Sequence, residues 1–232
     1  MPRKARKACK GLASVYSDDG GVTWSVGAFA PPGDEVQAFQ RSDGTVGAIV
    51  RGAGASYRRG KVYRWSRDGG VKWTPRNESA SSQTLLESLT GCSLLTIPGG
   101  EHDHNTTARD VAAFAAAPSR ILYSCPPLSA NHVADHIARR HLTVRMSTDG
   151  GATWPYALLI EEGASAYSDM ALDRSGHQSK GRASAAPHDV TIHIAYERGA
   201  HRFDEEIVYT RFTLADVYAA RIKPAAAFNF GV

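Results

Sequence analysis

One eight-residue pattern occurs three times in this chain and constrains its fold more than any other feature. The copies are Ser17–Trp24, Ser66–Trp73 and Ser147–Trp154, and each reads Ser-x-Asp-Gly-Gly-x-Thr/Lys-Trp. A Gly pair reaches positive φ without a steric penalty, while Ser and Asp side chains can accept hydrogen bonds from backbone N–H groups within a turn. The pattern therefore predicts a hairpin turn whose Trp packs into a core.

The spacing of the three copies indicates the architecture. Their Trp residues are 49 and 81 positions apart, from 24 to 73 and from 73 to 154. This spacing is too wide and too uneven for a solenoid, but it suits the blades of a β-propeller that carry loops of different lengths.

Short runs rich in β-branched and aromatic residues alternate with turn residues along the chain, which is typical of an all-β fold. Two of these runs flank the turn residues Ser42, Asp43 and Gly44, which predicts a hairpin. The expected strands are Leu12–Ser17, Glu35–Gln40, Val46–Arg51, Lys61–Ser66, Ser93–Ile97, Arg120–Cys125, Leu142–Ser147, Val190–Glu197 and Glu206–Phe212.

Only residues 213–220 read as a helix, because Thr213 can cap its N-terminus while Leu214 and Val217 lie on one face. We expect this helix to pack against the last blade. The Ala-rich segments 112–117 and 225–227 could form either helix or coil. Residues 101–110 and 174–187 are expected to be polar loops.

Composition excludes several classes of protein. The chain of 232 residues is 42% hydrophobic and contains no run near the ~20 apolar residues of a membrane span. Its net charge of +4 is smaller than the charge of five basic residues near its start, so the rest is slightly acidic and no nucleic-acid partner is implied. These five are Arg3, Lys4, Arg6, Lys7 and Lys10.

We expect one domain at residues 12–220, preceded by a disordered basic segment at 1–11 and followed by a tail at 221–232. No apolar segment follows the basic start, so no secretion signal is visible. The compartment stays open: cytoplasmic if Met1 is the true start, and lysosomal or secreted if sequence upstream is missing.

The cysteines indicate neither a disulfide framework nor a zinc site. Cys9, Cys92 and Cys125 are odd in number and lack Cys-x-x-Cys spacing, so we interpret them as small buried or incidental thiols. The segment 101–104, Glu-His-Asp-His, has metal-ligand residue types but no second cluster at a suitable spacing. We therefore expect no metal site.

The three repeats resemble the Asp boxes of the sialidase superfamily, six-bladed β-propellers that share the box with some non-enzymatic propellers. The resemblance implies that about four of the six blades are present here. In that family the boxes are structural and lie away from the substrate. The corresponding positions are Ser17, Asp19, Trp24, Ser66, Asp68, Trp73, Ser147, Asp149 and Trp154.

Further segments resemble that superfamily in the same order, from Leu12 to Asp216. The segment 34–51 is similar to Asn-Glu-Cys-Gln followed by a hairpin that ends in Asn-x-Arg, with Asp34, Val36 and Ile49 as departures. Residues 139–145 are similar to Arg-x-Asn-Leu-Thr-Val-Arg. Residues 162–170 look like Gly-Pro-Ser-Ala-Tyr-Ser-Asp-Leu, residues 196–199 match Tyr-Glu-Arg-Gly, and residues 206–214 match its closing strand.

The resemblance assigns a role to each matching residue. Tyr167 would be the nucleophile and Glu35 the base that takes its proton, because a phenol with a pKa of about 10 is a weak nucleophile at neutral pH. Arg51 and Arg139 would bind the substrate carboxylate, since a guanidinium can hold a carboxylate bidentately. Glu197 would orient an arginine.

Within residues 139–145 the sequence favours Arg139 by register, with Arg140 as the alternative and Arg145 as a structural residue. A negatively charged substrate would repel a carboxylate nucleophile, and sialidases with a Tyr nucleophile are a recognised exception among glycosidases.

The expected function is exo-α-sialidase activity, that is, hydrolysis of terminal sialic acids from glycoproteins, glycolipids or oligosaccharides with retention. No metal or organic cofactor is implied. Two parts of that machinery, a third arginine and the acid that protonates the leaving group, have no matching segment before Ser17, so we expect low activity from this chain. The alternative is a non-catalytic Asp-box propeller that binds carbohydrate or protein.

Overall fold

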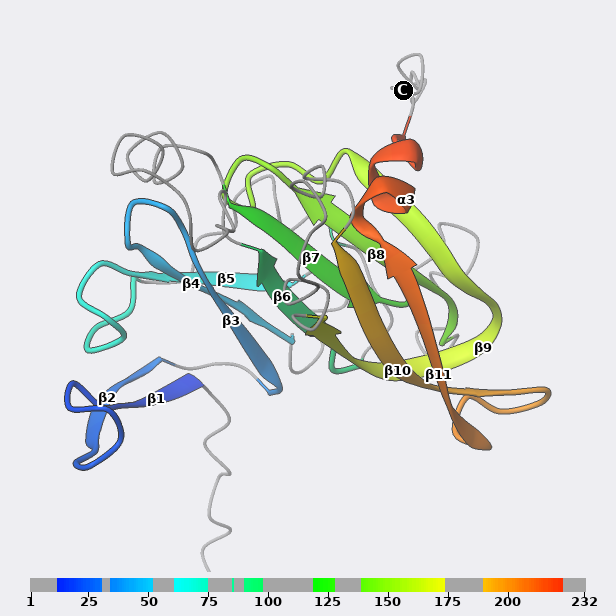
Figure 1. Cartoon of the computed structure of the whole chain (residues 1–232). Helices are drawn as coiled ribbons and strands as arrows, with labels where there is room; N and C mark the ends of the chain where they lie inside the picture. Colours follow the sequence, from blue (N-terminus) through cyan, green and yellow to red (C-terminus); the bar gives the residue numbers. More distant parts are fainter. Residues whose placement is uncertain are drawn as a thin grey trace, which may run out of the picture.

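The computed structural model describes residues 12–30, 34–51, 61–74, 85, 90–97, 119–127, 139–173 and 190–222. These residues form three antiparallel sheets and one helix (Figure 1). The first sheet pairs β1 (Leu12–Tyr16) with β2 (Ser25–Ala30). The second contains β3 (Val36–Gln40), β4 (Val46–Val50) and β5 (Val62–Ser66). The all-β expectation is confirmed.

The third sheet has six strands in chain order. They are β6 (Ser93–Ile97), β7 (Arg120–Cys125), β8 (Arg140–Ser147), β9 (Tyr156–Leu172), β10 (Thr191–Gly199) and β11 (Glu206–Thr213). Strand β9 pairs with β8 from Tyr156 to Ala164 and with β10 from Ala164 to Leu172. One long strand thus serves two blades, and together with the two smaller sheets the described residues supply the expected four.

The innermost strands of successive blades lie against one another. Strand β3 contacts β6, and β6 contacts β9. The hydroxyl of Ser93 at the start of β6 accepts the N–H of Met170 at 3.1 Å and donates to Asp169 at 3.1 Å. The second half of β9 is therefore held beside β6, and these inner strands determine which side chains meet between the blades.

The three repeats form the predicted turns. In the third repeat, Ser147 Oγ accepts the N–H of Gly151 at 2.8 Å, and Asp149 Oδ1 accepts the N–H of Thr153 at 2.8 Å. The other two repeats make the equivalent bonds. Both glycines of every repeat have positive φ, between 68° and 97°, which confirms the reason for the Gly pair.

The expectation that every repeat Trp is buried is wrong for the first repeat. Trp154 is 2% exposed, whereas Trp24 is 64% exposed. The second repeat, which follows β5, packs on the first sheet. The third repeat, which follows β8, packs on the second sheet. Trp73 Nε1 donates to Ser14 Oγ in β1 at 3.1 Å, and Arg41 Nε donates to Gly150 O at 2.7 Å. In the described part of the chain no sheet precedes β1, so Trp24 lacks such a surface.

Helix α3 (Leu214–Ala219) confirms the predicted cap and packing. The side chain of Thr213 accepts the N–H of Asp216, and the Asp216 carboxylate accepts the N–H of Thr213. Leu214 and Val217 are fully buried in the main core cluster with residues of β8, β9, β10 and β11. The helix thus packs against β11 of the last blade and also contacts β8 and β9.

Two strands and one covalent bond were not expected. Strands β2 and β9 were both missed, and in β9 Gly163 and the polar residues beside it resemble a loop. The interpretation of the cysteines as thiols is wrong for two of them: Cys92 and Cys125 form a disulfide with a Cα–Cα distance of 5.0 Å. The antiparallel register pairs Ser93 with Ser124, so these cysteines face each other across β6 and β7.

Several sequence expectations fall outside the described residues. These are the basic segment 1–11, the polar loops 101–110 and 174–187, the Ala-rich segments 112–117 and 225–227, and most of the expected tail. The domain limits therefore stay predictions. Within the residues that are described, no helix is long and apolar enough to cross a membrane.

The contrast between the repeats gives a first prediction. Trp154→Ala should lower the free energy of unfolding by about 3–5 kcal/mol, because it removes a buried aromatic side chain and leaves a cavity. Trp24→Ala is the matched control and should cost less than about 1 kcal/mol, since most of that side chain faces solvent. Urea unfolding would measure both, and equal losses would contradict this account of the repeats.

Candidate active site

Tyr167 and Glu35 meet between two blades. Glu35 directly precedes β3, and Tyr167 lies in the second half of β9. The Tyr167 hydroxyl donates a hydrogen bond to Glu35 Oε1 at 2.7 Å, although the residues are 132 positions apart. The contact expected from the sequence is present. A carboxylate oxygen in this position can accept the phenol proton directly.

Arg51 joins this pair from the end of the β3–β4 hairpin. Its Nη1 lies 2.7 Å from Glu35 Oε2 and 3.4 Å from the Tyr167 hydroxyl. The backbone N–H of Arg51 donates to Glu35 O at 2.8 Å, so the hairpin register places the two residues opposite each other. The Arg51 side chain is 19% exposed and that of Glu35 is 37% exposed, which leaves the ion pair open to solvent on one side.

Arg139 lies over the ring of the tyrosine. Its guanidinium carbon is 5.4 Å from the centre of the Tyr167 ring and 4.4 Å from the centre of the Phe203 ring. Phe203 lies in the turn between β10 and β11, and nothing in the sequence analysis singled it out. Both rings can hold the cation through cation–π attraction.

An irregular start to β8 places Arg139 there. His141 has a φ of 60°, which is unusual for a residue other than Gly, and the pairing with β9 shifts register at Arg140 and Leu142. The N–H of Ser165 donates to Arg139 O at 2.9 Å. Of the two candidate arginines, Arg139 therefore faces Tyr167, whereas Arg140 is exposed.

Glu197 lies behind the tyrosine on β10. Its Oε2 accepts the backbone N–H of Tyr167 at 3.4 Å, so the carboxylate contacts the strand that carries the phenol. Its role in orienting an arginine stays a prediction. Arg145, the expected structural residue, is partly buried within β8, and burial lowers the pKa of its guanidinium.

The surroundings of Tyr167 raise the pKa of its phenol above the ordinary value of 10.0. Burial has the largest effect, and the hydrogen bond to Glu35 raises the pKa further, while the charges of Arg51 and Arg139 act in the opposite direction. The free phenol is therefore protonated at neutral pH. It can act as a nucleophile only if a group in contact removes its proton as the new bond forms.

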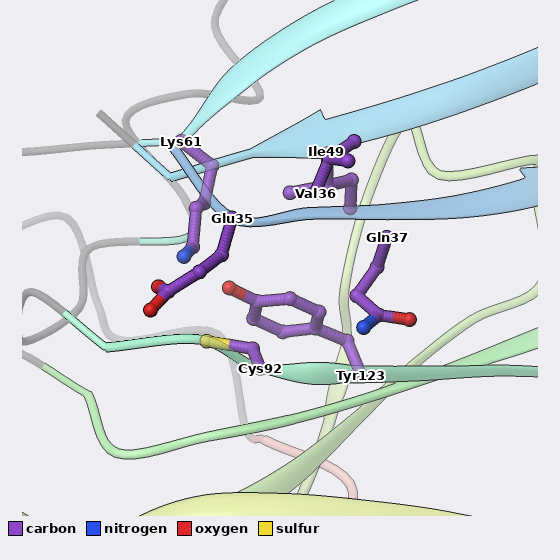
Figure 2. Close-up of a pocket in the computed structure, with 7 residues that line it drawn as sticks. All are labelled: Glu35, Val36, Gln37, Ile49, Lys61, Cys92 and Tyr123. Atoms are coloured by element: carbon purple, nitrogen blue, oxygen red, sulfur yellow. The ribbon is translucent and has the colours of Figure 1, made fainter. Parts of the chain in front are cut away.

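A small pocket adjoins Glu35, and the buried Lys61 is one of the residues that line it (Figure 2). The ammonium of Lys61, just before β5, points toward Glu35 in Figure 2, and Lys61 is 3% exposed. Its Nζ donates to Thr90 O at 3.0 Å. Burial lowers the pKa of Lys61 to about 7, with Glu35 opposing and Arg51 adding to this change. Lys61 was not predicted as a site residue, and its signal in the sequence is a lysine directly before a buried strand.

The described residues contain no group of three or more His, Cys, Asp or Glu side chains that could hold a metal ion. The group that does converge combines a phenol, a carboxylate and two guanidinium groups. This arrangement can deprotonate the phenol and attract an anionic ligand at the same time.

Comparison with known proteins agrees with the repeats and the fold. A family model described as a BNR repeat-like domain matches residues 4–179. The chain is also 31% identical over 204 residues to a protein named sialidase from Micromonospora viridifaciens, covering 87% of this chain and 25% of that protein. The chain thus spans about a quarter of the length of this relative.

Solved structures give the same fold at lower identity. The Hadza microbial sialidase Hz136 is 24% identical, with a TM-score of 0.59 over 88% of this chain and 32% of its own. The leech intramolecular trans-sialidase is 16% identical, with a TM-score of 0.60 over 91% of this chain and 28% of its own. These similarities establish the propeller fold. The chain belongs to the family of BNR repeat-like domains, within the sialidase superfamily of β-propellers.

Proposed function

We propose that this site belongs to an exo-α-sialidase, which releases terminal sialic acid from glycoconjugates with retention of configuration. The observation that carries the proposal is the 2.7 Å hydrogen bond from Tyr167 to Glu35 with two arginines beside it. The relative from Micromonospora viridifaciens, which is named a sialidase, supports the same substrate class.

In the first step the oxygen of Tyr167 attacks the anomeric carbon while Glu35 takes the phenol proton. The glycosidic bond breaks, and the departing oxygen takes a proton from an acid outside this group of residues. In the second step water attacks the same carbon and gives a proton to the conjugate base of that acid, while Tyr167 leaves as a phenolate and regains its proton from Glu35. Two displacements at one carbon retain its configuration.

The arginines fit the charge of the substrate. Sialic acid carries a carboxylate on its anomeric carbon, so a ligand held for attack by Tyr167 brings that carboxylate next to the phenol. Arg51 Nη1 lies 3.4 Å from the Tyr167 hydroxyl, and the Arg139 guanidinium carbon lies 5.4 Å from the centre of its ring. A carboxylate between them would receive charge-assisted hydrogen bonds.

The phenol gives the second prediction. Tyr167→Phe should reduce hydrolysis of a fluorogenic sialoside to background and leave the affinity for free sialic acid within a few-fold, because only the reacting oxygen is lost. Tyr196→Phe is a matched control, since that hydroxyl also contacts a glutamate, Glu161, at 3.4 Å. If Tyr167→Phe hydrolysed the sialoside as fast as the unsubstituted chain, the nucleophile would be misassigned.

The base gives the third prediction. Glu35→Gln keeps the shape of the side chain but cannot take up the phenol proton, so kcat should fall by roughly 10²- to 10⁴-fold. Glu162→Gln provides the control, because Glu162 lies on the same strand as Tyr167 and is exposed. Steady-state kinetics on both variants would decide the assignment, and a kcat retained in Glu35→Gln would rule it out.

The same assays separate the alternative function. A propeller without catalytic activity that binds carbohydrate would bind free sialic acid but would show no sialoside turnover that depends on Tyr167. Analysis of the products would further distinguish transfer of the sialic acid to water from transfer to another hydroxyl.

A further inference from the structure

A glycine backbone forms one wall of the contact between Tyr167 and Glu35. A side chain built on Gly91 would place its Cβ 2.8 Å from Tyr167 Cε1 and 3.2 Å from Glu35 Oε2. Distances under 3.0 Å do not occur for real Cβ atoms, so only glycine fits here without displacing the tyrosine ring. The main chain of Gly91 therefore limits how far the phenol and the carboxylate can move apart or tilt.

The segment on both sides of Gly91 is buried and anchored. Thr90 is 0% exposed and Cys92 is 5% exposed. On one side, the disulfide joins Cys92 to Cys125 in β7. On the other, Lys61 Nζ donates to Thr90 O at 3.0 Å in a buried hydrogen bond. Strands of two sheets thus hold this short wall from opposite ends.

The burial of Lys61 is energetically unfavourable and requires a physical explanation. Transferring an ammonium from water to the interior is unfavourable, and an apolar residue of similar length would fill the same volume without that penalty. The charged groups that act on Lys61 are Glu35, which favours the ammonium, and Arg51, which opposes it. An apolar side chain could not make the hydrogen bond from Lys61 to Thr90 O, which lies beside the residue that touches the reacting pair.

We propose that Lys61 is a positioning residue, which holds the Thr90–Gly91 segment against Tyr167 and Glu35 and so fixes the contact through which the phenol loses its proton. This inference rests on the proposed function for the roles of Tyr167 and Glu35. Lys61 holds the carbonyl of Thr90 and so fixes the position of Gly91. Because Gly91 has no side chain, its backbone can lie directly against Tyr167 and Glu35.

The test measures the ionisation of Tyr167 itself. Burial and the bond to Glu35 raise the pKa of this phenol, so a wall that shifts outward should let that pKa fall back toward 10. The pKa is read from the ¹³C NMR signal of the ring carbon that bears the hydroxyl, assigned with Tyr167→Phe. This readout needs no substrate.

Two substitutions should change the contact. Lys61→Met removes the donor to Thr90 O, and Gly91→Ala pushes a methyl group into the tyrosine ring. Both should lower the pKa of Tyr167. Both should also reduce the kcat for a fluorogenic sialoside by up to about 10²-fold with little change in KM, because the reacting groups are misplaced while the arginines remain. Lys72→Met is the control, since Lys72 is exposed in the second repeat.

The outcomes are separable. An unchanged Tyr167 pKa in folded Lys61→Met, or an equal change in Lys72→Met, would overturn the positioning role. If Lys61→Met does not fold, Lys61→Gln replaces it: its side chain is one atom shorter and cannot reach Thr90 O, so the same fall is expected, and no fall would overturn the role. If the pKa of Tyr167 falls as expected in the variants, but neither the variants nor the unsubstituted chain hydrolyse the sialoside, the proposed function fails while the positioning role stands.

Discussion

Packing between the inner strands of neighbouring blades is the constraint from which the site follows. Glu35 enters with β3, the Gly91 segment with β6 and Tyr167 with the second half of β9. None of the three is near the others in sequence. Their contacts exist because β3 lies against β6 and β6 lies against β9, where the Ser93 hydroxyl bonds to Met170 and Asp169. A shift between blades would therefore break the Tyr167–Glu35 bond before it disturbed any single sheet.

Within each blade, hairpin register refines what blade packing brings together. The turn at Gly44 fixes the β3–β4 register, which sets Arg51 opposite Glu35. At the start of β8 the regular register is instead interrupted, and His141 adopts a left-handed conformation that costs of order 1 kcal/mol or more. The interruption lies directly after Arg139, the guanidinium that packs between Tyr167 and Phe203. The strain is located where one side chain is directed into the site.

Local patterns were sufficient to predict the repeat turns and the capped helix, because hydrogen bonds within a few residues determine them. Most strands were predicted from their runs of β-branched and aromatic residues. They also identified Tyr167, Glu35, Arg51 and Arg139, since each lies in a segment resembling the superfamily. Residues defined by contacts between strands were missed. Cys92 meets Cys125 only through the β6–β7 register, Lys61 is buried only because β5 lies inside the fold, and Trp24 is exposed because its packing surface would come from another blade.

The charges of the site fit a nucleophile that is neutral until it reacts. Arg51 and Lys61 act on a single carboxylate, Glu35, in contact with the phenol, and Arg139 lies over the ring of Tyr167. In the proposed reaction an anionic sugar approaches Tyr167, and a protonated phenol does not repel it as a second carboxylate would. The raised pKa of Tyr167 keeps the phenol neutral during binding, but it makes attack depend on Glu35. The rate of the proposed reaction would then depend on the geometry of the hydrogen bond between Tyr167 and Glu35. For that reason Lys61 and the Thr90–Gly91 segment, which support this bond, belong to the site.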